Sequence, residues 1–207
     1  MSNLNYLTDN DNILAVFDYG SVVYGTNKKA SDHDLIVVVK NNENITHSKY
    51  DITVYTEKEF KSLAEIHEIS VLECLFLEKK HIHKNDLEIN FKLDKNLLRA
   101  SISAKSSNSW VKSKKKFIVE VDYNPYIAKK SAWHTLRILD FGIQLAREGR
   151  ITNYTESNLL LKPILECDSW DEIDKNFKSI YNSKSSAFKI LAPKQINENK
   201  ETKKMSY

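Results

Sequence analysis

The chain of 207 residues has few cysteines, little net charge and no long apolar run, and each shortage excludes a class of protein. Its two cysteines, Cys74 and Cys167, lie far apart, so we expect neither a disulfide framework nor a thiolate metal site, and a reducing compartment fits best. Lys and Arg number 31 against 28 Asp and Glu. A net charge of +3 is too small for nucleic-acid binding through overall charge, so any basic partner site must be local.

No apolar window approaches the roughly 18 residues that a membrane helix needs. The first residues also lack the basic and apolar regions of a secretion signal. We therefore expect a soluble, cytoplasmic protein without a membrane partner. Hydrophobic residues at 41% and charged residues at 29% are typical of globular proteins and exclude a chain that is disordered throughout.

The N-terminal part of the chain is rich in strand signals. Apolar runs predict strands over Ile13–Tyr19 and Leu35–Val39, and alternation of polar and apolar residues predicts a third over Tyr50–Tyr55. The polar turn residues at 41–44 predict a hairpin-like connection, and hence antiparallel pairing, between the second and third strands.

Helix signals dominate the sequence after the third predicted strand. A capping box predicts a helix over Glu57–Glu68, whereas residues 70–77 are ambiguous. Further helices are predicted from about Asp94 to Lys116 and from Pro125 to Glu148, where Gly149 supplies the stop signal.

This change of character predicts a small mixed β-sheet flanked by helices, an α/β or α+β unit over residues 1–92, followed by a helical domain over 93–192. Residues 193–207 contain almost nothing apolar and predict a disordered polar tail.

The candidate phosphate-binding and metal-binding residues lie in one stretch of the chain. Gly20 and Ser21 follow a buried strand, where we expect a helix to start and its free N–H groups, with a small hydroxyl, to hold phosphate oxygens. Asp32 and Asp34 stand two apart at the mouth of the next strand, so their side chains point to one side and suit Mg²⁺ or Mn²⁺. Asp51 begins the third strand and would converge on the same metals. A phosphate cradle beside clustered carboxylates is what two-metal nucleotidyl transfer from an NTP requires.

Each feature also has a plain structural alternative. Gly-Ser pairs are ordinary turn residues, Asp-X-Asp is commonly a solvated loop or helix cap, and Asp51 could be a surface carboxylate. His33 would point away from the two acids and serve structure, and Cys74 would belong to the core. His81 and His83 lack further nearby ligands, so we interpret them as surface residues.

Two basic groups lie in the helical part. Lys130, His134 and Arg137 fall at i, i+4 and i+7, opposite an apolar stripe, and either bind the triphosphate or form a solvated face. The second group, Lys112 with the lysines at 114–116, lies beside Trp110 and Phe117. It is either solvated or a binding site for an RNA acceptor.

The spacing of these residues resembles the signature of the polymerase β-like nucleotidyltransferase superfamily, in the "predicted nucleotidyltransferase" branch of bacteria and phages. The positions that carry the resemblance are Gly20, Ser21, Tyr24, Gly25, Thr26, Ser31, Asp32 and Asp34, and more loosely Asp51 to Phe60 with Lys130, His134, Arg137 and Gly149. The resemblance covers roughly residues 13–150, and it implies the fold, a two-metal mechanism and use of an NTP.

We therefore predict a metal-dependent enzyme that moves a nucleoside monophosphate from an NTP to an acceptor hydroxyl and releases pyrophosphate. Asp32, Asp34 and Asp51 would be catalytic and bind two Mg²⁺ or Mn²⁺ ions, while Gly20, Ser21, Lys130, His134 and Arg137 would bind the nucleotide. The acceptor (RNA, protein or a small molecule) and the oligomeric state stay open. The alternatives are a non-catalytic nucleotide-binding or partner-binding module, antitoxin-like or regulatory, and a structural accessory protein.

Overall fold

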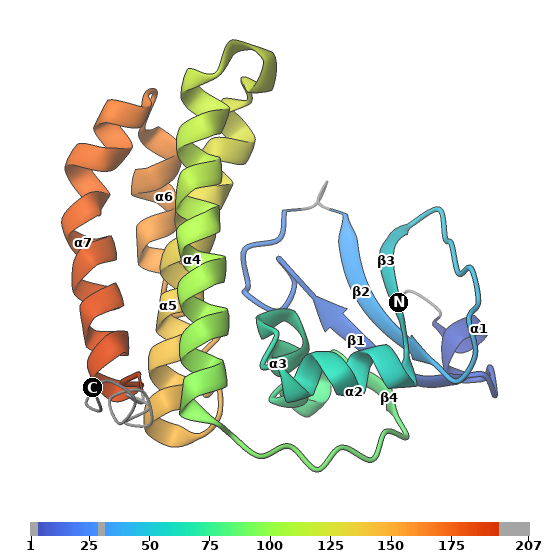
Figure 1. The fold of residues 1–207 in the computed structure, drawn as a ribbon. Helices are drawn as coiled ribbons and strands as arrows, with labels where there is room; N and C mark the ends of the chain where they lie inside the picture. The colour runs from blue at the N-terminus through green and yellow to red at the C-terminus, as the bar shows by residue number, and fades with distance from the viewer. Residues whose placement is uncertain (1–3, 29–31, 195–207) are drawn as a thin grey trace, which may run out of the picture.

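The computed structural model describes residues 4–28 and 32–194 and contains a small sheet with short helices beside a bundle of longer helices (Figure 1). This confirms the predicted fold class, a small mixed sheet flanked by helices and followed by a helical region. The strands are β1 (Ile13–Tyr19), β2 (His33–Val39), β3 (Tyr50–Thr56) and β4 (Ile82–Asn85), arranged in the order β3-β2-β1-β4.

The direction of β3 differs from the prediction. β1 runs antiparallel to both β2 and β4, but β2 and β3 are parallel, with Asp34 opposite Asp51 and Val37 opposite Val54. The predicted hairpin at residues 41–44 is therefore wrong, because residues 40–49 return to the starting edge of the sheet instead. Parallel pairing matches the polar start of β3 with the polar start of β2, whereas antiparallel pairing would set Asp51 beside the buried end of β2.

The two faces of the sheet are covered unequally. Helices α2 (Glu57–Glu65) and α3 (Ile69–Leu75) pack on one face, where Phe17, Ile36 and Phe60 are among the buried side chains. On the other face, α1 (Asn5–Thr8) packs against a second buried cluster. The capping box of α2 is confirmed, although the helix ends three residues before the predicted boundary, and the ambiguous stretch at 70–77 forms α3.

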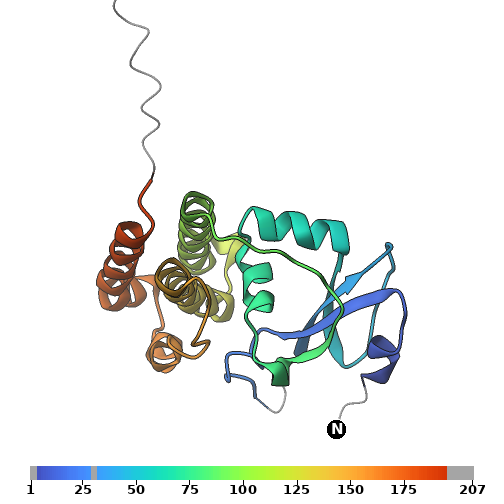
Figure 2. The same cartoon turned by 90° about the horizontal axis from the view of Figure 1, so that it is seen from below.

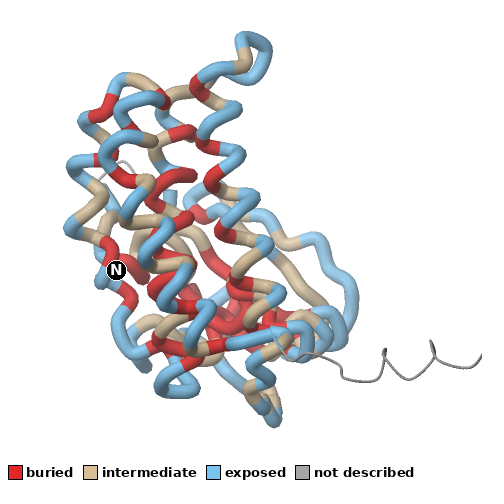
Figure 3. Tube along the Cα trace, turned by 60° about the vertical axis from the view of Figure 1, so that its left-hand side comes forward, coloured by how far each residue is buried: buried red, intermediate tan, exposed pale blue. Residues whose placement is uncertain are grey.

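The helical bundle consists of α4 (Lys95–Ile118), α5 (Pro125–Glu148), α6 (Asn158–Glu166) and α7 (Trp170–Leu191), seen almost end-on in Figure 2. Both predicted helices are confirmed: Asp94 caps α4, and Gly149 ends α5 in the left-handed conformation at φ +75°. α5 contacts each of the other three and has the most buried residues of them. Figure 3 shows the buried residues, in red, along the inside of the bundle and in the sheet region. Two single turns of 3-10 helix, η1 (Lys79–His81) and η2 (Glu120–Asp122), complete the elements.

The core of the bundle continues into the sheet region. Val23 and Tyr24, from the segment after β1, and Ile69 and Leu72 of α3 belong to the same buried cluster as Leu136 of α5. Residues 86–94 connect β4 to α4, so the predicted division at residues 92 and 93 falls in this connection. Most of the predicted tail, 193–207, lies outside the described residues. Within them, no helix combines the length and apolar character needed to cross a bilayer.

Candidate active site

The segment of residues 20–26, which we call the signature loop, forms turns and not the expected helix start. The Tyr24 N–H donates to the Gly20 carbonyl at 3.2 Å, and the Thr26 N–H donates to the Ser21 carbonyl at 2.9 Å, so the loop curls back on itself. Gly20 and Gly25 have φ values of +66° and +65°, which a right-handed helix cannot include. Any phosphate-binding site here is therefore formed by turns and not by a helix N-terminus.

Gly20 lies directly against Asp34. A Cβ built on Gly20 would be 2.1 Å from Asp34 Oδ2, and the positive φ already disfavours other residues at this position. Asp34 in turn faces its ladder partner Asp51 at the shared end of β2 and β3. The structure thus brings together three of the predicted residues, one glycine from the loop and one acid from each parallel strand.

Nearby charges at this end of the sheet shift the pKa of Asp34 in opposite directions. Partial burial raises the pKa of Asp34 above its usual value, the Asp51 carboxylate raises it further, and Lys130 acts in the opposite direction. Asp32 also raises the pKa of Asp34, so all three predicted acids share one electrostatic neighbourhood. Within residues 4–28 and 32–194, no cation lies within salt-bridge distance of Asp34 or Asp51.

This arrangement fits a hard cation. Adjacent carboxylates with no ion-pair partner among the described residues offer the oxygen ligands that Mg²⁺ and Mn²⁺ prefer. Among the described residues, no group of three His, Cys, Asp or Glu side chains is already spaced around a metal position. The fit therefore rests on Asp34 and Asp51, with the exposed Asp32 beside them along the chain.

The predicted basic stripe of α5 lies on the side of that helix nearest the sheet, but its members differ. Lys130 reaches the neighbourhood of Asp34 and also lies over the Tyr126 ring, with Nζ 5.0 Å from the ring centre. Arg137 is only 5% exposed, and its guanidinium carbon lies 3.6 Å from the centre of the Tyr24 ring. Its Nη2 donates to His134 Nδ1 at 2.6 Å. Burial, and then the charge of Arg137, hold the pKa of His134 well below its usual range, which keeps it a neutral acceptor.

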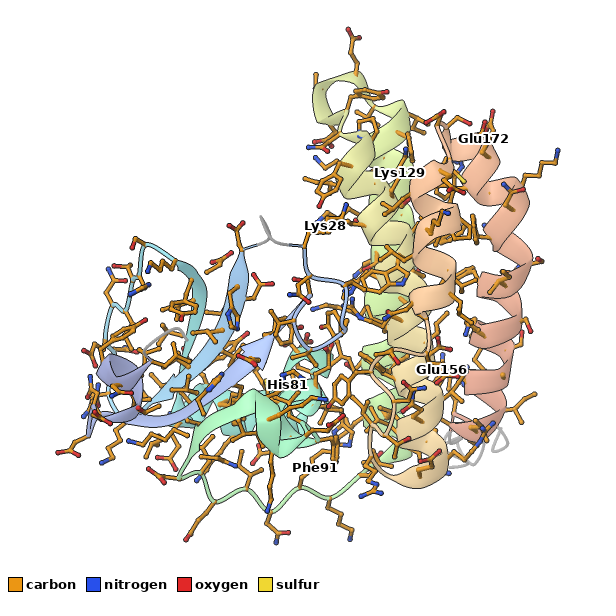
Figure 4. All side chains as sticks on the ribbon, turned by 180° about the vertical axis from the view of Figure 1, so that it is seen from behind. Lys28, His81, Phe91, Lys129, Glu156 and Glu172 are labelled. Carbon is orange, nitrogen blue, oxygen red and sulfur yellow. The ribbon has the colours of Figure 1, made fainter. Side chains whose placement is uncertain are left out.

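Sequence reasoning missed the buried contacts that hold the signature loop to the rest of the protein. The Tyr24 hydroxyl donates to the carboxylate of Glu73, and the Asn158 side chain donates to the Tyr24 carbonyl at 2.7 Å. Glu73 is 1% exposed, and burial raises its pKa to about 6 against the opposing effects of Arg137 and Tyr24. Figure 4 shows Lys28, just beyond the loop, between the sheet and α5. The loop is therefore fixed by both parts of the chain.

A second cluster, also unpredicted, occupies the opposite face of the sheet. Asp18 on β1 accepts hydrogen bonds from His33 Nε2 at 2.8 Å, His81 Nδ1 at 3.0 Å and His83 Nε2 at 2.6 Å. His83 is exposed, as expected, and His81 is half-buried, but the interpretation of both as surface residues did not include their bonds to Asp18. The structural role expected for His33 agrees with its contact with Asp18. The signal was an acid inside a buried strand, since a buried carboxylate needs partners.

Comparison with known proteins identifies the first half of the chain. Residues 4–103 match the profile of the nucleotidyltransferase domain family. That segment is similar to a nucleotidyltransferase domain. The matched range contains the sheet, the signature loop and the three predicted acids, and it is consistent with the polymerase β-like superfamily. The chain matches no curated protein and no solved structure. This match supports nucleotidyl transfer as the general activity.

Proposed function

We propose that this protein transfers a nucleoside monophosphate from an NTP to an acceptor hydroxyl in a metal-dependent reaction that releases pyrophosphate. The observation that carries the proposal is the contact of Gly20 with Asp34 next to Asp51. Nucleotidyl transfer needs phosphates and metal-binding acids at one point, and a residue without a side chain lets the loop backbone approach the acids.

In this reaction Asp32 and Asp34 would hold two Mg²⁺ or Mn²⁺ ions, and Asp51 would hold the catalytic one and accept the proton of the attacking hydroxyl. When bound, the ions neutralise the triphosphate and lower the pKa of the attacking oxygen. The mutual repulsion of these acids supports the assignment, because a bound cation relieves it. The N–H groups of the signature loop, with the Ser21 hydroxyl, would bind phosphate oxygens.

The basic residues of α5 would act at two levels. Lys130, whose charge already reaches Asp34, is the candidate for direct contact with the triphosphate. Arg137 is buried against the Tyr24 ring and donates to His134, so we propose that Arg137, held by His134, positions the loop through Tyr24. Within the stripe, Lys130 would contact the nucleotide, and Arg137 and His134 would hold the loop that binds it.

The decisive experiment incubates the protein with each α-³²P-labelled NTP, Mg²⁺ or Mn²⁺, and either total RNA or cell lysate. Label on RNA or on protein supports the proposal and identifies the acceptor class. The matched control is Asp34→Asn, which preserves shape and removes the charge. Label in neither fraction, with any NTP and either metal, would overturn the proposal and favour a non-catalytic nucleotide-binding module. Equal labelling by the Asp34→Asn protein would show that the assigned acids are not the catalytic ones.

A further inference from the structure

The turn between α4 and α5 forms an exposed surface, of which the proposed catalytic roles use Lys130 alone. We call residues 111–130 the hairpin tip. Large apolar and aromatic side chains protrude from it: Val111 is 48% exposed, Ile118 58%, Val121 94%, Tyr123 60% and Tyr126 62%. Half of the large exposed hydrophobic side chains in the described parts of the chain thus lie on this one turn and its flanks. Such concentration on a protruding element marks an interaction surface.

The hairpin tip is also where the positive charge of the protein is concentrated. It contains six lysines, Lys112, Lys114, Lys115, Lys116, Lys129 and Lys130, but only two acids, Glu120 and Asp122. Its net charge of +4 exceeds the +3 of the whole chain, so the remaining residues together are slightly negative. Lys116 is paired with Asp122 at 3.1 Å. Lys112, Lys114 and Lys115 are exposed, and no carboxylate of the described residues forms an ion pair with them.

This surface is continuous with the candidate active site. Lys130 links the two, because its charge acts on Asp34 while its Nζ lies over the ring of Tyr126, one helical turn closer to the tip. Figure 1 shows the turn between α4 and α5 extending toward the same end of the molecule at which β2 begins.

We propose that the hairpin tip binds single-stranded RNA and delivers its terminal hydroxyl to the acids. This inference rests on the proposed function and names its acceptor. Unpaired lysines match a phosphate backbone, and exposed tyrosine rings offer stacking surfaces for unpaired bases. The combination favours a single strand over a duplex, because paired bases do not expose their faces to side chains.

Binding is measured without NTP, by fluorescence anisotropy of a short labelled single-stranded RNA, using the full chain with the Asp34→Asn substitution. Lys112→Glu/Lys115→Glu reverses two charges on the hairpin tip. Lys162→Glu/Lys189→Glu is the matched control, since it makes the same charge change at exposed lysines of α6 and α7. We expect the tip variant to lose affinity at least about tenfold and the dependence of log K on log salt to fall by about 1.4, while the control stays near the parent.

A second pair of variants tests stacking. Tyr126→Ala should weaken binding by about tenfold, whereas Tyr126→Phe, which keeps the ring, should bind like the parent. Circular dichroism melts confirm that each variant is folded.

Equal losses in the tip and control variants, tighter binding of duplex than of single-stranded RNA, or no RNA binding would overturn the inference. If label from the NTP appears on protein and RNA does not bind, the proposed function stands and this inference fails. RNA binding without transfer to any acceptor would overturn the proposed function and the delivery of the hydroxyl, and would leave the hairpin tip as an RNA-binding surface only.

Discussion

Two aspartates at the same end of the sheet experience opposite environments. Asp18 and Asp34 lie on neighbouring strands but on opposite faces, since Asp34 pairs with Tyr19 and Asp18 pairs with Leu35. Burial alone would raise the pKa of Asp18, but hydrogen bonds from His83, His81 and His33 lower it to about 2. Asp34 accepts no such bonds from the described residues, and its pKa is raised. Asp18 is thus satisfied by hydrogen bonds within the protein, whereas Asp34 has no such hydrogen bond among the described residues.

The largest effect should come from Asp34→Asn. Transfer should fall at least about 100-fold, because a metal ligand and its charge are lost, whereas stability should be unchanged or slightly higher, because clustered negative charge is relieved. Steady-state kinetics at several Mg²⁺ concentrations and a urea titration measure the two effects. Near-normal turnover with unchanged metal dependence would contradict the division between the two faces.

Asp18→Ala should produce the opposite pattern, a loss of stability. Three imidazole donors lose their shared acceptor, and we expect the free energy of unfolding to drop by about 2–4 kcal/mol. The midpoint and slope of urea denaturation measure this loss. A change below about 0.5 kcal/mol would indicate that the cluster contributes no more than an ordinary surface contact.

Glu73 is a third case, a buried acid whose pKa is raised from 4.5 to about 6. Below pH 4.5 it is protonated in both states, but between 4.5 and about 6 the unfolded chain ionises before the folded protein does. Its contribution to stability is therefore lost as the pH rises through this window. Glu73→Gln, which still accepts from Tyr24, should remove a decline of about 2 kcal/mol. Denaturation curves from pH 4 to pH 7 test this, and parallel profiles for both proteins would refute it.

Ser21→Ala should have the smallest effect, a loss in NTP use of about fivefold to tenfold, because the backbone donors of the signature loop remain. The ratio kcat/KM for the preferred NTP measures it. Complete inactivation of a folded variant would identify the Ser21 hydroxyl as a reacting group, a role that the present assignment does not contain.

Local signals explain which elements could be predicted from the sequence. β1 and α5 match their predicted ranges, since an apolar run bounded by Gly20 and a helix bounded by Pro125 and Gly149 are specified by neighbouring residues. The direction of β3 could not be found in this way. The direction of β3 depends on which end of β2 pairs with its polar start, and this pairing joins residues that are distant in sequence.

The acids of the candidate site were recognisable because their spacing carries the signature, but their supporting residues were not. Asp18 meets His81 and His83 across more than sixty positions of sequence, and β4, which carries His83, has only four residues. Glu73 and Tyr24 likewise meet only in the folded chain. Burial and pairing of such groups are properties of packing, which periodicity does not encode. The sequence analysis predicted no individual helix after Gly149. A signal for α7 was nevertheless present, because Ser169 caps the helix and Glu172 lies in its first turn.

The contacts of Tyr24 also impose an order of events during synthesis. Domains generally begin to fold from the N-terminus as the chain leaves the ribosome. The signature loop is complete in sequence by Thr26, yet two of its anchors, Arg137 and Asn158, are translated more than a hundred residues later. A nascent chain that has formed the sheet already has its acids but not the fixed loop beside them. The candidate site is thereby completed only when the helices have emerged and packed against the sheet.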